Sequence, residues 1–197
     1  MFALERTLDQ HTVTLIEEGV DKLADYATVP IGFEVRSRVC LSDLRASPDG
    51  PITVTPEEPH WKDYDAYERP TALPARFDMS NWLIVSAFDG ERRLGGVIAA
   101  RDTLGCDMLD GRTDLVVPFD VRVHPAARGQ GVGRTLFEHV IVWARANGCT
   151  ELIVETQDVN VGACRFYLAM GCRLHSAQEG AYGPELDEAM VIWRLRL

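Results

Sequence analysis

The sequence lacks any apolar run of the length that a membrane-spanning helix needs, and its N-terminus has no basic segment followed by an apolar one. We therefore expect neither a membrane segment nor a signal peptide. The five cysteines are scattered, and no two of them form a Cys-x-x-Cys pair, so neither a zinc site nor a disulfide framework is indicated. We expect no metal site, and a reducing cytoplasm is the default location.

Positive charge is also scarce, because 20 Lys and Arg stand against 30 Asp and Glu, giving a net charge of −10. Nucleic acid and anionic membranes both require a basic surface, so both are disfavoured as partners. The acidity is compatible with a cationic substrate such as an amine, and also with a role in solubility alone. A length of 197 residues with 46% hydrophobic residues fits one globular domain with a sizeable core.

What the sequence does contain is a glycine-rich turn between a predicted strand at 115–123 and a predicted helix at 133–147. The turn reads Arg128-Gly-Gln-Gly-Val-Gly133. Its three glycines remove side chains where backbone N–H groups would point outward, and a helix N-terminus adds positive partial charge. We interpret this turn as a cradle for a phosphate or pyrophosphate.

The glycine spacing distinguishes between known cradles. It does not meet the dinucleotide pattern Gly-x-Gly-x-x-Gly, and it lacks the Gly-Lys-Ser/Thr ending of a P-loop. Arg128, Gly131 and Gly133 instead fill the pattern Arg/Gln-x-x-Gly-x-Gly/Ala, which resembles the acetyl-coenzyme A pyrophosphate loop of the GNAT N-acetyltransferase superfamily. The resemblance implies an enzyme that uses acetyl-CoA and has the mixed α/β GNAT fold. The cofactor-binding residues that it implies are Val121, Arg122, Val123, Arg128, Gly129, Gln130, Gly131, Val132, Gly133, Arg134, Asn160, Ala163 and Phe166.

The remaining pattern is consistent with this fold class. Apolar residues at roughly helical spacing predict a helix over 4–27, so we divide the chain into an N-terminal helical extension at 1–30 and a GNAT domain at 31–197. Such an extension is compatible with a homodimer. Further predicted elements are a strand at 33–40, a short strand at 52–55, a hairpin with strands at 82–88 and 94–100, a strand at 151–156, a helix at 161–170, and closing strands at 172–176 and 190–196.

Two features of the predicted sheet bear on the site. The strand at 115–123, its crossover helix and the strand at 151–156 form a βαβ unit, so these two strands should be parallel. Pro118 cannot donate a ladder hydrogen bond, so we expect a bulge or a break in pairing there. The resemblance implies that the two strands splay at this point and take the pantetheine arm, with the backbone amides of Val121 and Val123 exposed to it.

Acetyl transfer to an amine requires a deprotonated amine and a proton for the leaving thiolate. The segment Asn160-Val-Gly-Ala-Cys-Arg-Phe-Tyr167 is similar to the family's Asn-x-x-Ala-x-x-Phe-Tyr helix, and the similarity implies that Tyr167 is the general acid and that Asn160 bonds the cofactor arm. Asp120 and Glu155 lie near the ends of the two parallel strands and are the candidate carboxylates for orienting or deprotonating the amine. Each has a structural alternative, as a solvated carboxylate or an ion-pair partner of Arg122.

The acceptor is expected to meet the proline-rich segment 56–81, where aromatic rings stand beside carboxylates and can hold an ammonium group. We name Trp61, Tyr64, Asp158 and Tyr182 as substrate contacts. An ordinary surface loop is the alternative interpretation of this segment.

Three stretches resemble the streptothricin acetyltransferases within GNAT: Phe33-Glu-Val, the region Pro59-His-Trp-Lys-Asp-Tyr64, and Glu155-Thr-Gln-Asp-Val-Asn160 with the helix that follows it. The resemblance implies a small-molecule amine as acceptor, of streptothricin, lysine or polyamine type, and a connection to antibiotic resistance. Two alternatives stay open. One is acetylation of a protein N-terminus or lysine, and the other is a CoA-binding sensor without turnover.

Overall fold

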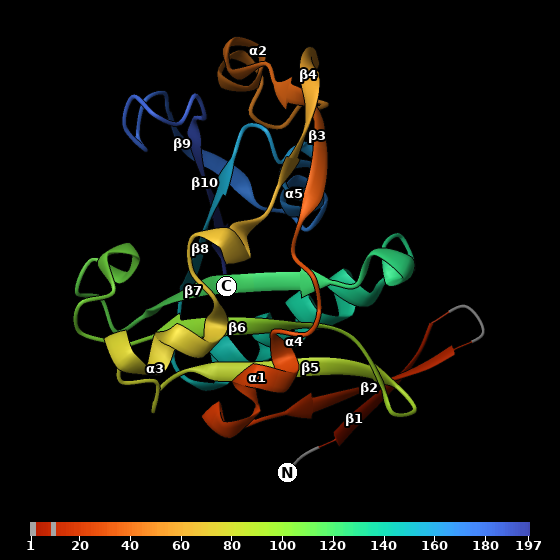
Figure 1. The fold of residues 1–197 in the computed structure, drawn as a ribbon. Coiled ribbons are helices and arrows are strands. Elements are labelled where there is room, and N and C mark those ends of the chain that lie inside the picture. Colours follow the sequence, from red (N-terminus) through yellow and green to blue (C-terminus); the bar gives the residue numbers. More distant parts are fainter. Residues whose placement is uncertain (1–2, 9–10) are drawn as a thin grey trace. The chain divides into compact units, whose positions relative to one another are not determined.

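The computed structural model describes residues 3–8 and 11–197, with side chains from residue 13 onward, and the chain forms two compact units (Figure 1). The first unit consists of the chain up to Gly32, of Asp63–Leu152, and of Leu197. The second unit consists of Phe33–Lys62 and Ile153–Arg196. Strand β8 (Glu151–Gln157) begins in the first unit and continues in the second.

An antiparallel sheet in the order β1-β2-β5-β6-β7 forms the centre of the first unit. Its strands are β1 (Ala3–Leu8), β2 (His11–Glu17), β5 (Leu83–Asp89), β6 (Arg92–Arg101) and β7 (Leu115–Val123). Strand β7 also pairs in parallel with the start of β8, through Leu115 with Glu151 and Val116 with Leu152. The predicted parallel pairing is therefore confirmed.

Both faces of this sheet are covered, which explains why β6 is buried without interruption from Leu94 to Ala100. Helix α4 (Val132–Ala146) packs against β5, β6 and β7, and the short helix α1 (Leu23–Tyr26) packs against β6; Figure 1 shows α1 in front of the sheet and α4 behind it. A Cβ atom at Gly96 would overlap the ring of Tyr26, so the close approach of α1 depends on glycine there.

The predicted N-terminal helix is wrong. Strands β1 and β2 occupy half of the predicted range, and among its described residues only a 3-10 turn (Val20–Lys22) and α1 are helical; residues 9 and 10 lie outside the described residues. Strand β2 pairs with β5, with Val13 and Leu15 buried and Thr14 between them less so. This stretch forms a strand despite its helical spacing of apolar residues, because β-branched residues dominate it and a neighbouring strand supplies hydrogen bonds.

The predicted irregularity at Pro118 is confirmed. In the pairing of β6 with β7, Ala99 faces Pro118 and Ile98 faces Asp120, so Phe119 has no register partner. One extra residue on one strand of an antiparallel pair is a β-bulge, which bends the strand and re-aims the side chains beyond it. The bulge thus fixes the direction of the segment from Asp120 to Val123.

The second unit contains a two-stranded sheet, the last strands of the eight-stranded sheet, and two helices. Strand β3 (Phe33–Val39) pairs with β4 (Val54–Lys62), and the rest of β8 is followed in its sheet by β10 (Met190–Arg196) and β9 (Arg173–Gln178). Helix α2 (Leu41–Ala46) contacts β9, and helix α5 (Val161–Ala169) contacts β3.

The segment 56–81 is more regular than predicted. Its first part belongs to β4, where Pro56 and Pro59 are tolerated because β4 is an edge strand whose outer side needs no ladder donors. The rest forms the 3-10 turns η2 (Tyr64–Ala66) and η3 (Pro70–Ala72) and helix α3 (Leu73–Arg76). A further 3-10 turn, η4 (Asp107–Leu109), precedes β7.

Candidate active site

The glycine-rich turn adopts the backbone geometry of an anion cradle. After β7 the chain makes the 3-10 turn η5 (Pro125–Ala127), and Gly129 and Gly131 then have φ values of +75° and +85°. This left-handed region favours glycine, since a Cβ atom would strain the backbone. Both glycines are therefore required by the path of the chain into α4.

The first turn of α4 has the character of an anion-binding site. Its N-cap is Gly131, so no side chain caps the helix, and the N–H groups of Val132, Gly133 and Arg134 belong to the first turn, which has no intrahelical partners. The helix dipole adds positive potential at the same place. The residues present thus fit a pyrophosphate, held by backbone amides.

The polar side chains of the loop brace its backbone. Arg128 Nε donates to the Val123 carbonyl at 3.1 Å and its Nη2 donates to the Gly32 carbonyl at 3.2 Å. Partial burial lowers the pKa of Arg128. Gln130 Nε2 donates to the Ala126 carbonyl at 2.8 Å. In this state the two side chains hold the shape of the cradle, while Arg134 is exposed.

Strand β7 presents the amides of Val121 and Val123 at its free edge. The N–H of His124 donates to the Leu94 carbonyl of β6 at 2.7 Å. Successive backbone groups of a strand point to opposite edges, so the N–H of Arg122 also faces β6, whereas those of Val121 and Val123 face away from it. This is the orientation predicted for contact with a cofactor arm.

Asp120 and Arg122 form a buried ionic cluster with two residues that the sequence did not single out, Tyr26 and Asp65. Arg122 donates to Asp120 through Nε at 2.8 Å and through Nη2 at 2.6 Å, and the Tyr26 hydroxyl donates to the same carboxylate at 2.7 Å. Burial and the Asp120 charge raise the pKa of Tyr26 well above its usual value. The Arg122 side chain, named as a cofactor contact, is enclosed by these partners, and its backbone N–H faces β6 rather than the free edge of β7.

The second unit brings Glu155 and Tyr182 together. The Tyr182 hydroxyl donates to Glu155 Oε1 at 2.8 Å and accepts a hydrogen bond of 2.7 Å from Gln157 Nε2. Glu155 and Gln157 are two residues apart on β8, so they lie on one face of the strand. All three side chains are partly exposed, which leaves the Glu155 carboxylate within reach of a ligand.

Helix α5 carries the residues assigned to the acid step. The Asn160 side chain caps it by accepting from the Ala163 N–H at 3.1 Å, which explains the spacing of these two residues. Tyr167 is 5% exposed and its ring lies 5.3 Å from that of Phe166. The neighbouring Cys164 is buried, and burial raises the pKa of its thiol to about 12, so it is a poor nucleophile at neutral pH.

The predicted substrate contacts lie in different environments. Trp61, on β4 opposite Glu34, is 66% exposed, and Tyr64 is half-buried in η2 of the first unit. Asp158 is 3% exposed and accepts from the Ala189 N–H at 2.9 Å. Burial raises the pKa of Asp158, and its partners give it a structural role within the second unit.

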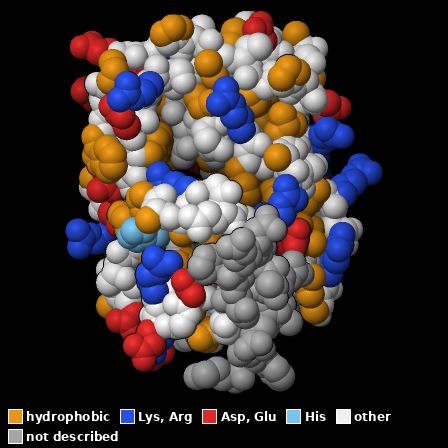
Figure 2. Space-filling model, turned by 90° about the vertical axis from the view of Figure 1, so that its right-hand side faces the viewer, with side chains coloured by type: hydrophobic (Ala, Val, Ile, Leu, Met, Phe, Trp, Pro, Cys, Tyr) orange, Lys and Arg blue, Asp and Glu red, His pale blue; other side chains and the backbone are white. Residues whose placement is uncertain are grey.

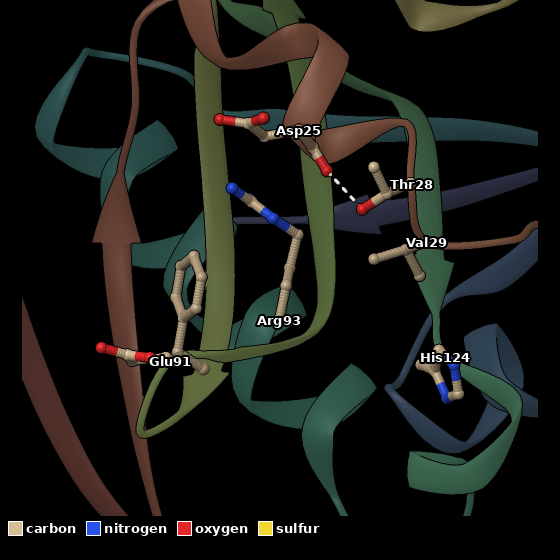
Figure 3. A pocket seen from close by; sticks show the side chains of 7 residues that line it. Asp25, Thr28, Val29, Glu91, Arg93 and His124 are labelled. Carbon is tan, nitrogen blue, oxygen red and sulfur yellow. Dashed lines mark hydrogen bonds between the residues drawn. The ribbon is translucent and has the colours of Figure 1, made fainter.

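A pocket of about 420 Å³ in the first unit was not anticipated from the sequence (Figure 3). Its lining comes from α1 and the residues after it, from the β5–β6 hairpin and from the end of β7: Asp25, Thr28, Val29, Phe88, Glu91, Arg93 and His124. Figure 3 shows Arg93 extending across it toward Asp25. Glu18 already neutralises this guanidinium, with Nη2 2.9 Å from Oε1. The other two carboxylates of the lining are Glu91 and Asp25, and Asp25 pairs with Lys22 at 3.7 Å.

Two further findings describe charge and metal-binding capacity. On the face drawn in Figure 2, acidic and basic side chains are interspersed among apolar and uncharged ones. Within residues 3–8 and 11–197, no three His, Cys, Asp or Glu side chains are grouped so as to hold a metal ion. In the same part of the chain, every helix is too short or too polar to cross a membrane.

Comparison with known proteins matches the model of the Acetyltransferase (GNAT) family to residues 51–172, more than half of the chain. Streptothricin acetyltransferase A of Bacillus subtilis is 33% identical over 76 residues, which are 38% of this chain and 44% of that protein. The streptothricin acetyltransferase of Streptomyces lavendulae is 41% identical over 76 residues, 37% and 40% of the two proteins. The chain thus spans less than half the length of these curated relatives.

Solved structures show the same fold over most of the chain. A structure from Bacillus anthracis, assigned to the streptothricin acetyltransferases and solved with acetyl coenzyme A, superposes with a TM-score of 0.75 at 21% identity over 94% of this chain and 99% of its own. The structure of nourseothricin acetyltransferase superposes with a TM-score of 0.68 at 20% identity, over 93% of this chain and 98% of its own. The predicted mixed α/β fold is confirmed.

Proposed function

The chain belongs to the GNAT acetyltransferase family, and on this premise we propose that it transfers an acetyl group from acetyl-CoA to a primary amine of a small molecule. The observation that carries the proposal is the turn from Gly129 to Gly131, whose left-handed glycines lie between the bulged strand β7 with its following turn η5 and the start of α4. A pyrophosphate is the ligand for which such a turn is built.

The cofactor would be held mainly by backbone groups. The first-turn amides of α4, from Val132 to Arg134, would receive the pyrophosphate, and the amides of Val121 and Val123 would bond the amide groups of the pantetheine arm. Arg128 and Gln130 would act indirectly by keeping the loop in shape. The bound cofactor supplies the acetyl thioester.

We assign the carboxylate step to Glu155. Asp120 already accepts hydrogen bonds from Tyr26 and Arg122, and protonating it would weaken the bonds that neutralise a buried guanidinium. Glu155 has Tyr182 as its hydrogen-bond partner and is partly exposed, so it can accept a proton from the amine through a water or orient the amine. Asp120 would then position β7.

Tyr167 would give a proton to the leaving thiolate. A phenol is a weak acid whose pKa is close enough to that of a thiol for this transfer to be efficient. Its burial on α5 and its ring contact with Phe166 hold the phenol in one orientation. Asn160 would fix the first turn of the same helix.

The acceptor would be a cationic amine of the streptothricin, lysine or polyamine type. The named relatives that act on streptothricin support this choice, as does the net charge of −10, because the acceptor is an ammonium ion before it reacts. Trp61, Tyr64 and Tyr182 are the aromatic side chains that we assign to contact it.

The test is a calorimetric titration of acetyl-CoA into the purified protein, followed by measurement of CoA-thiol release with a panel of amines that includes streptothricin, lysine derivatives and polyamines. We expect micromolar binding and amine-dependent thiol release. Tyr167→Phe should lower kcat by about 100-fold and leave acetyl-CoA binding within twofold. Absence of acetyl-CoA binding, or full turnover by Tyr167→Phe, would contradict the proposal.

A further inference from the structure

The guanidinium of Arg122 is completely enclosed, with a side-chain exposure of 0%. Besides its two bonds to Asp120, it donates to Asp65 through Nη2 at 3.0 Å and through Nη1 at 3.2 Å, and to the Val29 carbonyl through Nη1 at 2.9 Å. A guanidinium has five N–H donors, and these five bonds use all of them. Arg122 is therefore a fixed structural centre.

This centre ties a surface turn to the strand beside the bulge. Asp65 lies in η2, a turn of three residues whose N-cap residue, Asp63, accepts a hydrogen bond of 3.0 Å from the Asp65 N–H through its carboxylate. Asp120 follows the bulged Phe119 directly. Because both aspartates accept from the same Nη2 of Arg122, this one side chain links η2 to β7.

The cluster also carries an excess of negative charge. Asp65 and Asp120 supply two carboxylates against one guanidinium, and their side chains are 16% and 13% exposed. Tyr26 contributes no charge, since its raised pKa keeps the phenol protonated. An uncompensated carboxylate at the edge of the interior attracts cations more strongly than one in bulk water.

The turn that Asp65 holds bears two aromatic rings. Tyr64 is half-buried, and Tyr67 follows η2 with 66% of its surface exposed. A tyrosine face attracts an ammonium group, and a nearby negative charge reinforces that attraction. The two tyrosines thus flank Asp65, the residue that is bonded to Arg122 of β7, the strand to which we assign the pantetheine arm.

We propose that Asp65 is a positioning residue for the acceptor: held by Arg122, it fixes the turn of Tyr64 and Tyr67 as a wall that receives the cationic amine. The inference rests on the proposed function, because it takes the acceptor to be an ammonium ion. It assigns Asp65 no contact with the reacting atoms. Its effect should therefore appear in the KM for the acceptor, with little change in kcat.

Asp65→Asn tests this assignment, because it removes the charge of Asp65 at nearly constant shape. We expect the acceptor KM to rise at least tenfold, while kcat stays within threefold and the Kd of acetyl-CoA within twofold. Asp65→Glu keeps the charge, so its acceptor KM should lie between those of Asp65→Asn and the unmodified protein. Glu68→Gln is the matched control, because Glu68 lies just after the same turn but pairs with exposed Arg76; its acceptor KM should equal that of the unmodified protein.

Two measurements keep the inference open to contradiction if Asp65→Asn does not fold. Hydrogen exchange of the amides at 64–68 should speed up in any folded Asp65 variant without a change in β7, and this readout needs no turnover. Tyr67→Leu leaves the cluster intact and should raise the acceptor KM at least fivefold. An acceptor KM within twofold of the unmodified protein, in either Asp65→Asn or Tyr67→Leu, would overturn the inference. Failure of the unmodified protein to bind acetyl-CoA would instead contradict the proposed function.

Discussion

The hydroxyl of Tyr182 donates a hydrogen bond of 2.8 Å to the carboxylate of Glu155, which joins β8 to the segment between β9 and β10. The hydroxyl also accepts from Gln157, so its own proton is directed to Glu155. A carboxylate has about four acceptor positions, and this bond uses one of them. Glu155 is therefore held in orientation and keeps the capacity to accept from an amine or a water.

From this relationship we predict that Glu155→Gln lowers kcat by about 100-fold or more, because an amide cannot take the proton of the amine. Tyr182→Phe removes only the orienting hydroxyl, so it should lower kcat clearly less than Glu155→Gln does. Steady-state CoA-thiol release with saturating acetyl-CoA measures both effects. A Glu155→Gln variant that keeps kcat within threefold would remove Glu155 from the mechanism.

A second prediction separates the effect of a glycine on acetyl-CoA binding from its effect on stability. Gly131 and Gly148 have φ values of +85° and +79°, and they stand before and after α4. Replacing either by Ala should lower the free energy of unfolding by about 1–2 kcal/mol, since L residues are strained in this region. Only Gly131→Ala should also weaken acetyl-CoA binding, by tenfold or more. Urea denaturation and calorimetry test the two effects, and equal binding losses in both variants would argue against the cradle.

A third prediction concerns acid stability. The hydrogen bonds from Arg112 and then from Thr150 lower the pKa of Asp114 from 3.8 to about 2. A depressed carboxylate pKa contributes stability that is fully present above pH 3.8 and is lost as the pH falls through about 2.

The free energy of unfolding should therefore decline as the pH falls from about 4 to 2, and Asp114→Asn should make that decline shallower. Urea midpoints measured across this range for both proteins provide the check. Parallel pH profiles for the two proteins would show that Asp114 is not a source of the decline.

A fourth prediction follows from thiol burial. Cys106, Cys149, Cys164 and Cys172 are buried, and burial raises the pKa of each; for Cys164 and Cys172 it reaches about 12. Since the thiolate is the reactive form, iodoacetamide at pH 8 should modify half-buried Cys40 first in the native protein. Peptide mass spectrometry resolves the sites. Faster modification of Cys164 than of Cys40 would contradict the conclusion that burial makes Cys164 a poor nucleophile.

Much of the fold near the cradle follows from local sequence. Strand β7 begins and ends at the predicted residues, because a run of apolar residues that alternate with charged ones at its end leads into His124-Pro125. The start of α4 is marked by the glycines, and the bulge by Pro118. In each case the signal is a property of one residue type, such as a missing Cβ or a missing N–H, that acts whatever the surroundings are.

The failures occur where the partner is distant in sequence. Strand β2 was predicted as helix because its spacing alone does not reveal that β5 is there to pair with it. Of strand β4 only a short strand at 52–55 was predicted, because two prolines follow, which an edge position tolerates and a central one would not. Both elements depend on hydrogen bonds to another segment, and local periodicity carries no information about them.

The same distinction separates the two parts of the candidate site. The sequence by itself determined the glycine cradle, the order of strand, loop and helix, and the family to which they belong. Only the tertiary structure decided that Arg122 is buried between Asp120 and Asp65, 57 residues away, and that Tyr182 orients Glu155. A backbone conformation is specified by adjacent residues, whereas the environment of a charge is specified by whatever the fold packs around it.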